Sequence, residues 1–159
     1  MATFLRRGTY WVVNQSAIPT LLKRVQKSTG PRPSEVQAHN TKGHQVAANA
    51  MTILIAVAKH SPALFRPHIA ELSRIIAGGV EESPSKKAAI GALGVEIALM
   101  ALANVVRWDS KLAAGIDKKT NDRVVKLALG TSWRQAKFAA RYLPFAKNGA
   151  VVCAEVIEV

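Results

Sequence analysis

Apolar residues recur at helical spacing along this chain of 159 residues, between turns that are marked by proline and glycine. The clearest example is the stretch 117–147, which predicts two helices joined at Gly130-Thr131. Each of these helices has one apolar side, and that side can be buried only against other helices. Strands would instead alternate apolar and polar residues at every second position. We therefore predict an all-α fold in which helices pack in pairs.

The two predicted helices of 117–147 each have a stripe of residues for the core. Ser132 is expected to cap the second helix, and Gln135 three residues later would complete a capping box. Trp133 and Phe138 are interpreted as core residues rather than as platforms on which bases stack. The residues expected on the apolar sides are Val124, Val125, Leu127, Ala128, Leu129, Trp133, Ala136, Phe138, Ala139, Ala140, Leu143 and Phe145.

The other side of this helical hairpin is cationic, and its side chains are candidate contacts for DNA phosphates or for an acidic partner protein. They are Lys118, Lys119, Arg123, Lys126, Arg134, Lys137 and Arg141. Spacings of three, four and seven residues place most of them on one face of their helix. A solvated helix face is the alternative explanation for any single one. Residues 111–147 nevertheless hold nine Lys or Arg and two acids, in a chain of net charge +12, which favours contact with a polyanion.

Helices and breaks are also predicted upstream of the hairpin. Residues 45–60 predict a buried helix, because they are apolar on most sides. Residues 28–44 contain two prolines and two glycines and predict a loop. The next helix runs from Pro62 to about Ile76, and Pro67 inside it should kink or break it. A short helix is expected over KLAAGI, which ends near Gly115.

The longest predicted helix runs from about Pro84 to Arg107 and contains an apolar run that could span a bilayer, Ala88–Val106. Glu96 lies at the centre of that run, where a charge would cost roughly 2.5–3.5 kcal/mol in lipid. Small residues recur along the run at Gly91, Gly94, Ala98 and Ala101, which would let a neighbouring helix approach closely. We therefore predict a buried central helix, and a small membrane protein is the alternative.

A spacing of roughly 40 residues per helix pair is typical of armadillo and HEAT arrays. The helix starts at Pro62, at Pro84 and after Thr131 repeat only loosely, so a compact bundle is the alternative architecture. Apolar residues continue to Val159 without a polar capping unit. We expect residues 1–159 to form a single HEAT/armadillo-like helical-repeat segment, an α-solenoid truncated at both ends.

No motif in the sequence indicates catalysis. His39 and His44 have no cysteine nearby, so their spacing does not predict a metal site. Gly91 and Gly94 lack the following Lys-Ser/Thr of a phosphate-binding loop, and no nucleophile-elbow pattern is present. We therefore expect no enzyme activity, no metal and no cofactor.

Several stretches together resemble one protein family. They are VVNQSAIPTLLKRV, HSPALFRPHIAELSRIIA, ALANVVRWDSKLA and DKKTNDRVVKLALGTSWRQAKFAARYLPF, of which the run Gly130–Arg141 is the most specific. They are similar to the HEAT-repeat regulators of sister chromatid cohesion that associate with cohesin, the "precocious dissociation of sisters" family, in its fungal form. The resemblance covers residues 10–150, apart from a stretch around 78–96.

This resemblance implies a non-enzymatic scaffold that regulates sister chromatid cohesion on chromatin in the nucleus. Such a scaffold would bind the kleisin subunit of cohesin and engage cohesin-release and acetylation factors. The resemblance carries over no individual binding residue. The alternative function is a stand-alone basic helical protein that binds nucleic acid.

Overall fold

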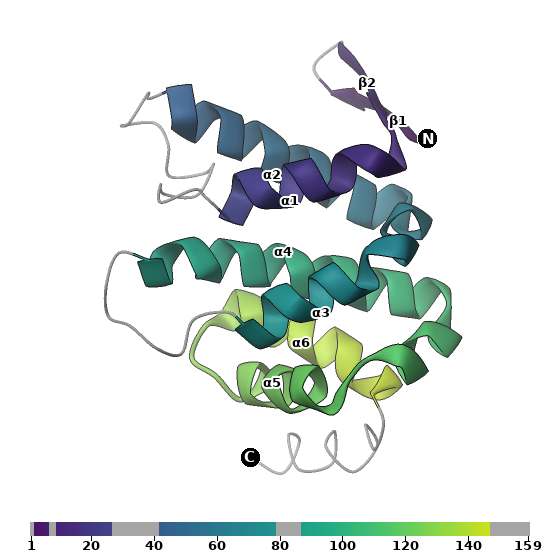
Figure 1. Ribbon diagram of the computed structural model, residues 1–159, viewed down its shortest axis with the longest axis vertical. Helices are drawn as coiled ribbons and strands as arrows, with labels where there is room; N and C mark the ends of the chain where they lie inside the picture. The colour runs from purple at the N-terminus through teal and green to yellow at the C-terminus, as the bar shows by residue number, and fades with distance from the viewer. Residues whose placement is uncertain (1, 7–8, 27–41, 79–86, 147–159) are drawn as a thin grey trace.

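The structure is a computed structural model that describes residues 2–6, 9–26, 42–78 and 87–146 (Figure 1). Within these residues the chain forms three successive helix pairs. The pairs are α1 (Ile18–Gln26) with α2 (Lys42–His60), α3 (Ile69–Gly78) with α4 (Lys87–Trp108), and α5 (Lys118–Ala128) with α6 (Trp133–Tyr142).

The three pairs are stacked in sequence order. The two helices of each pair contact each other, and each pair also contacts the next one. Helix α4 packs against α2 on one side and α6 on the other, while α3 packs against α5 (Figure 1). Such nearest-neighbour stacking of helix pairs is the arrangement of a helical-repeat solenoid. The predicted all-α helical-repeat class is therefore confirmed.

Each helix contributes a stripe of buried side chains at the spacing of an amphipathic helix. In α1 the stripe is Ile18, Leu22 and Val25, which are at most 2% exposed. In the other short helices the buried residues include Leu72, Ile76, Val124, Leu127, Ala139 and Tyr142. Full burial of one large apolar side chain stabilises the fold by about 1.5–3 kcal/mol, so these stripes hold the stack together.

Helix α4 is the central helix of the stack. It contacts α1, α2, α3 and α6, and the residues from Val95 to Val106 are buried apart from the half-buried Asn104. Asn104 donates a hydrogen bond from its side chain to the carbonyl oxygen of Ala58, which ties α4 to the end of α2. Within the described residues, no helix combines the length and apolar character needed to cross a membrane. The buried central helix is confirmed, while its predicted start at Ser83-Pro84 lies outside the described residues.

The predicted break at Pro67 is present. Residues Pro62–His68 form a 3-10 helix, η3, and the α-helix α3 begins only at Ile69. The 3-10 helix is a packed element, because Leu64 and Phe65 are buried in the core. Another 3-10 helix, η4 (Ser110–Gly115), forms where the short helix over KLAAGI is predicted.

Two features differ from the prediction. Helix α2 begins at Lys42, so the predicted loop does not extend to His44; the rest of that loop lies outside the described residues. Gly43 does not stop the helix, since a glycine inside a helix costs only about 1 kcal/mol relative to alanine. The chain also begins with a two-stranded antiparallel hairpin, β1 (Ala2–Arg6) and β2 (Thr9–Val13), in which Phe4 pairs with Trp11.

A part-buried polar network joins α6 to the start of α5. The hydroxyl of Tyr142 donates to Oδ1 of Asn121 at 2.6 Å. The amide nitrogen of Asn121 in turn donates to the carbonyl oxygens of Ile116 and Asp117 at 3.3 and 3.1 Å. Tyr142 is fully buried, and this burial raises the pKa of its hydroxyl to about 12. These hydrogen bonds hold α6 against the start of α5, and the Tyr142 hydroxyl stays protonated at neutral pH.

Replacing Tyr142 by phenylalanine should lower the free energy of unfolding by about 1 kcal/mol at neutral pH, because the part-buried Asn121 loses its donor. The pKa of Tyr142 is raised in the folded state, so folding favours the protonated hydroxyl; this stabilisation is complete below pH 10 and is lost as the pH rises toward 12. The difference between native and variant proteins should therefore shrink across that range. Urea unfolding followed by circular dichroism would measure it, and a constant difference would contradict the assignment.

Candidate functional site

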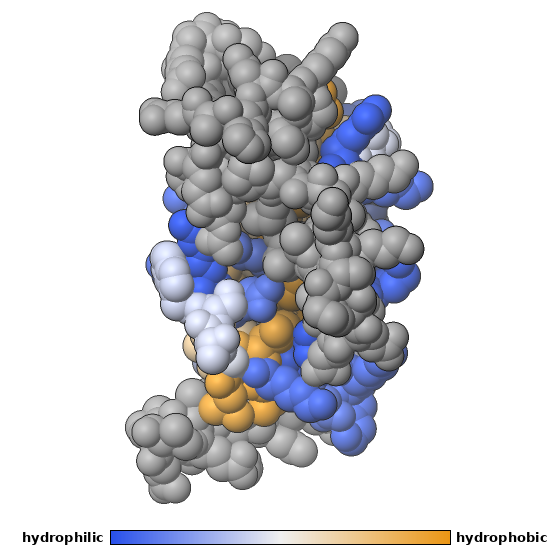
Figure 2. Space-filling view, turned by 90° about the vertical axis from the view of Figure 1, so that its left-hand side faces the viewer, coloured by the Kyte–Doolittle hydropathy of each residue, from blue (hydrophilic) through white to orange (hydrophobic). Residues whose placement is uncertain are grey.

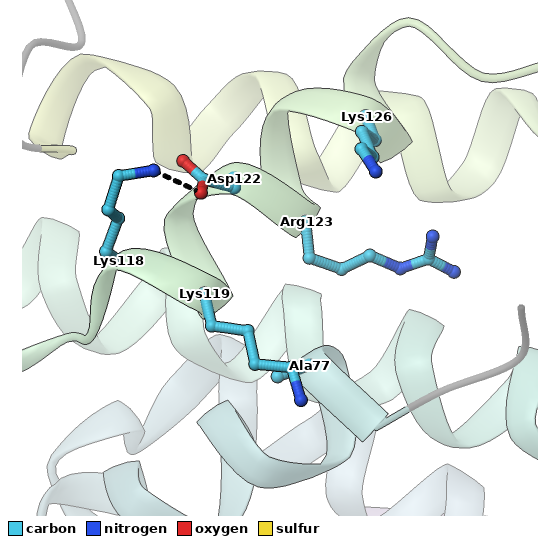
Figure 3. A pocket seen from close by; sticks show the side chains of 6 residues that line it. All are labelled: Ala77, Lys118, Lys119, Asp122, Arg123 and Lys126. Atoms are coloured by element: carbon cyan, nitrogen blue, oxygen red, sulfur yellow. Dashed lines mark hydrogen bonds and ion pairs between the residues drawn. The ribbon is translucent and has the colours of Figure 1, made fainter.

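Helix α5 runs beside the end of α3, and an open groove of about 490 Å³ lies between them. The groove is lined by Ala77 of α3 and by five residues of α5 (Figure 3). These five are Lys118, Lys119, Asp122, Arg123 and Lys126. Four of the seven cations predicted as contacts therefore surround one groove, with a single carboxylate among them.

The local sequence explains why α5 is held in this position. Asp117 is the N-cap residue, and its carboxylate accepts a hydrogen bond from the backbone N–H of Thr120 at 2.6 Å. Hydrogen bonding by Thr120 lowers the pKa of Asp117 below its usual value, so the cap stays ionised. The hydroxyl of the fully buried Thr120 is 3.4 Å from the carbonyl oxygen of Ser73, to which it donates. The hydrogen bond to Asp117 stabilises the start of α5, and the hydroxyl of Thr120 links α5 to α3.

The basic side chains of the groove differ in their ion pairing and in their exposure to solvent. Lys118 forms an ion pair with Asp122, Nζ to Oδ2 at 2.6 Å. Both side chains are more than half exposed, so this pair contributes little to stability. Lys119 and Lys126 are exposed, and Arg123 is half-buried. In Figure 3, Lys119 extends toward Ala77 and Arg123 reaches along the groove.

The three cations of α6 do not line this groove. Arg134 and Arg141 each lie over an aromatic ring of their own helix: the guanidinium carbon of Arg134 is 5.1 Å from the centroid of Trp133, and that of Arg141 is 5.7 Å from the centroid of Phe138. Such contacts are cation–π interactions. Lys137 is exposed. The structure thus places the α5 cations around one site and leaves the α6 cations outside it.

Several residues predicted for the apolar sides lie at the surface instead. Trp133 is 65% exposed and Leu129 is 57% exposed, and Ala140 is exposed as well. Trp133 precedes the buried Tyr142 by nine residues, which is two and a half turns, so the two side chains leave α6 on opposite sides. The interpretation of Trp133 as a core residue is wrong. Phe138 is half-buried and packs against the core, as predicted.

The predicted capping box at the start of α6 is not formed as expected. Ser132 is the N-cap residue, but its side chain makes no capping hydrogen bond. Its carbonyl oxygen accepts the backbone N–H of Ala136 at 2.8 Å, so the helix starts through backbone bonding.

The groove is lined by groups that can attract anions. Ammonium and guanidinium groups donate hydrogen bonds to carboxylates or phosphates and attract them electrostatically. No cluster of three or more His, Cys, Asp or Glu is found in the part of the chain that the structure describes. Two lining residues were not predicted: Asp122 was detectable from its position four residues after Lys118, whereas Ala77 had no sequence signal.

The sequence model of one protein family, described as sister chromatid cohesion protein PDS5, matches residues 1–159. The match includes the stretch around 78–96, residues 1–9 and residues 151–159, which the resemblance described above did not cover. No curated protein and no solved structure matches the chain.

Proposed function

Because the chain belongs to the family of the sister chromatid cohesion protein PDS5 and so has a role in sister chromatid cohesion, we propose that it is a non-enzymatic scaffold acting on cohesin. In this proposal it works on chromatin in the nucleus. It binds the kleisin subunit of cohesin, and it engages the factors that release or acetylate cohesin. Its stacked helix pairs provide a rigid surface for an extended partner segment.

The gathering of Lys118, Lys119, Arg123 and Lys126 around one groove carries this proposal. A partner segment with Asp or Glu side chains would neutralise these cations through charge-assisted hydrogen bonds. The groove is open, so a chain passing along α5 could enter it without unfolding a helix. We therefore assign the groove to an acidic stretch of the kleisin subunit.

The test compares two double variants with equal charge changes in binding to the purified kleisin subunit. Lys119→Glu/Lys126→Glu reverses two exposed cations of the groove. Lys23→Glu/Lys111→Glu reverses two exposed cations elsewhere, on α1 and η4. The groove variant should weaken binding by about tenfold or more, and the control by less than about threefold. Equal weakening by both variants, or no binding by the native chain, would reject the proposal.

Non-specific DNA contact is the second candidate function, and the net charge of +12 favours it. A short DNA duplex titrated over a range of salt concentrations would test it, since each neutralised phosphate adds about 0.9 to the salt slope. A steep slope together with no kleisin binding would favour a stand-alone nucleic-acid-binding protein. A shallow slope with kleisin binding would favour the scaffold.

A further inference from the structure

The turn between α5 and α6 exposes two large apolar side chains. Leu129 is the C-cap of α5 and Trp133 is the first residue of α6, and more than half of each side chain is exposed. The turn lies on the left of Figure 1, and Figure 2, which views the molecule from that side, shows hydrophobic surface among hydrophilic side chains in the lower part of the molecule. Leu129 and Trp133 are four residues apart and both are more than half exposed, so this turn is a candidate contact for a partner protein.

Cationic side chains adjoin these two residues. Arg134 lies over the indole ring of Trp133, with its guanidinium carbon 5.1 Å from the ring centroid. The exposed Lys137 follows Trp133 by four residues and so shares its face of α6. Residues 118–141 contain seven Lys or Arg and the single acid Asp122. We call the set Leu129, Trp133, Arg134 and Lys137 the turn surface.

We propose that the turn surface docks an acidic segment of a partner protein that inserts one aromatic or aliphatic side chain beside Trp133. Charge complementarity selects the acidic segment, because seven of the eight charged residues of 118–141 are Lys or Arg. The apolar side chain of the partner covers Leu129 and the edge of the indole ring. Trp and Arg are the residue types that most often dominate the binding energy of an interface.

The apolar half of the turn surface favours a peptide over DNA. Leu129 is aliphatic and 57% exposed, and a phosphate backbone has no group that would remove it from water. One face of the Trp133 ring is already covered by Arg134, so that face is not open to a stacking base. In a peptide with one apolar side chain among carboxylates, the apolar side chain matches Leu129 and Trp133. The carboxylates match Arg134 and Lys137.

This inference does not rest on the function proposed for the groove. Neither Trp133 nor Arg134 lines the groove, and no residue of the turn surface belongs to it. Substitutions can therefore separate the two sites. Lys119→Glu, on the groove alone, reports on the groove, while Trp133→Ala reports on the turn surface.

The test uses the full chain and a panel of synthetic peptides made of Asp, Glu and Ser, with Phe, Leu, Tyr or Ser at the central position. Trp11→Phe and Trp108→Phe leave Trp133 as the single tryptophan of the three, so its fluorescence reports contact directly. Binding of the Phe, Leu or Tyr peptide should shift the emission of Trp133 to shorter wavelength. The Ser peptide should bind at least about tenfold more weakly than the best of these.

Affinity measurements on variants complete the test. In the otherwise native chain, Trp133→Ala should weaken binding of the best peptide by about tenfold or more, as expected of an interface hot spot. The matched control is Trp108→Ala, which removes another exposed tryptophan, 51% exposed, and should change the affinity less than about twofold. In the single-tryptophan chain, Lys119→Glu should change the peptide affinity that is read from the Trp133 emission by less than about twofold, because this emission reports the turn surface and not the groove. Equal binding of all peptides, equal effects of the two tryptophan substitutions, or tighter binding of a short DNA duplex would overturn the proposal.

Discussion

Replacing Phe65 by alanine is expected to lower the free energy of unfolding by about 4 kcal/mol, a large part of the stability of a chain of this size. Phe65 is fully buried, and the 3-10 helix η3 that carries it contacts α1, α2, α3 and α4. Its ring therefore lies where the first two helix pairs meet, and its loss leaves a cavity that the rigid helices cannot close. Urea unfolding followed by circular dichroism would measure the change.

The neighbouring Arg66 provides the control, because it is exposed on the same 3-10 helix. Arg66→Ala should change the free energy of unfolding by less than about 0.5 kcal/mol. If Phe65→Ala prevents folding, Phe65→Leu keeps much of the buried volume and should cost about 1 kcal/mol. A loss below about 1 kcal/mol for Phe65→Ala would show that η3 is not packed as described.

Replacing Ala98 by leucine is expected to destabilise the protein by about 2 kcal/mol, although leucine is more hydrophobic. Ala98 and Ala101 on α4 are fully buried, and α4 has neighbouring helices of all three pairs against it. The added atoms have no space without moving a helix, and overpacking of a dense core typically costs 1–3 kcal/mol. Thermal and urea unfolding of the variant would test this.

The same substitution at Ala140 is the matched control, because this residue lies exposed on α6. Ala140→Leu should change the free energy of unfolding by less than about 0.5 kcal/mol. A stabilising effect of Ala98→Leu would mean that α4 is less tightly surrounded than the structure indicates.

The basic face of α5 could be predicted because it depends on local geometry alone. A helix repeats every 3.6 residues, so Lys119, Arg123 and Lys126 share a face wherever α5 is placed. The groove itself could not be predicted, since it is formed with Ala77 of α3, far away in the sequence. The position of Ala77 relative to α5 depends on how the pair of α3 and α4 stacks on the pair of α5 and α6.

The exposed positions of Leu129 and Trp133 show where apolar composition misleads. Leu129 follows the buried Leu127 by two residues, which turns its side chain to the far side of α5. Residue type alone predicts that both residues lie in the core, whereas their phase along each helix places them outside. Relative to the buried Val124 and Tyr142, Leu129 and Trp133 lie on the far side of their helices, which indicates surface positions.

The N-terminal hairpin was missed for a different reason. Residues 2–6 and 9–13 are short runs that include Thr, Tyr, Trp and Val, which are residues that favour strands. The segment between them has just two residues, as is common in β-hairpins. The two strands have five residues each, which is too short a stretch to predict a hairpin beside the helical periodicity of the remaining chain.

The central claim, that the groove between α3 and α5 receives the kleisin subunit, is tested most directly by site-specific photo-crosslinking with assembled cohesin. A photoreactive amino acid would replace Lys119 in the groove or, as the control, Lys23 on α1; both positions are exposed. The account predicts a cross-link from position 119 to an acidic stretch of the kleisin subunit and none from position 23. Equal cross-linking from both positions, or cross-linking from position 119 only to other subunits or to DNA, would contradict it.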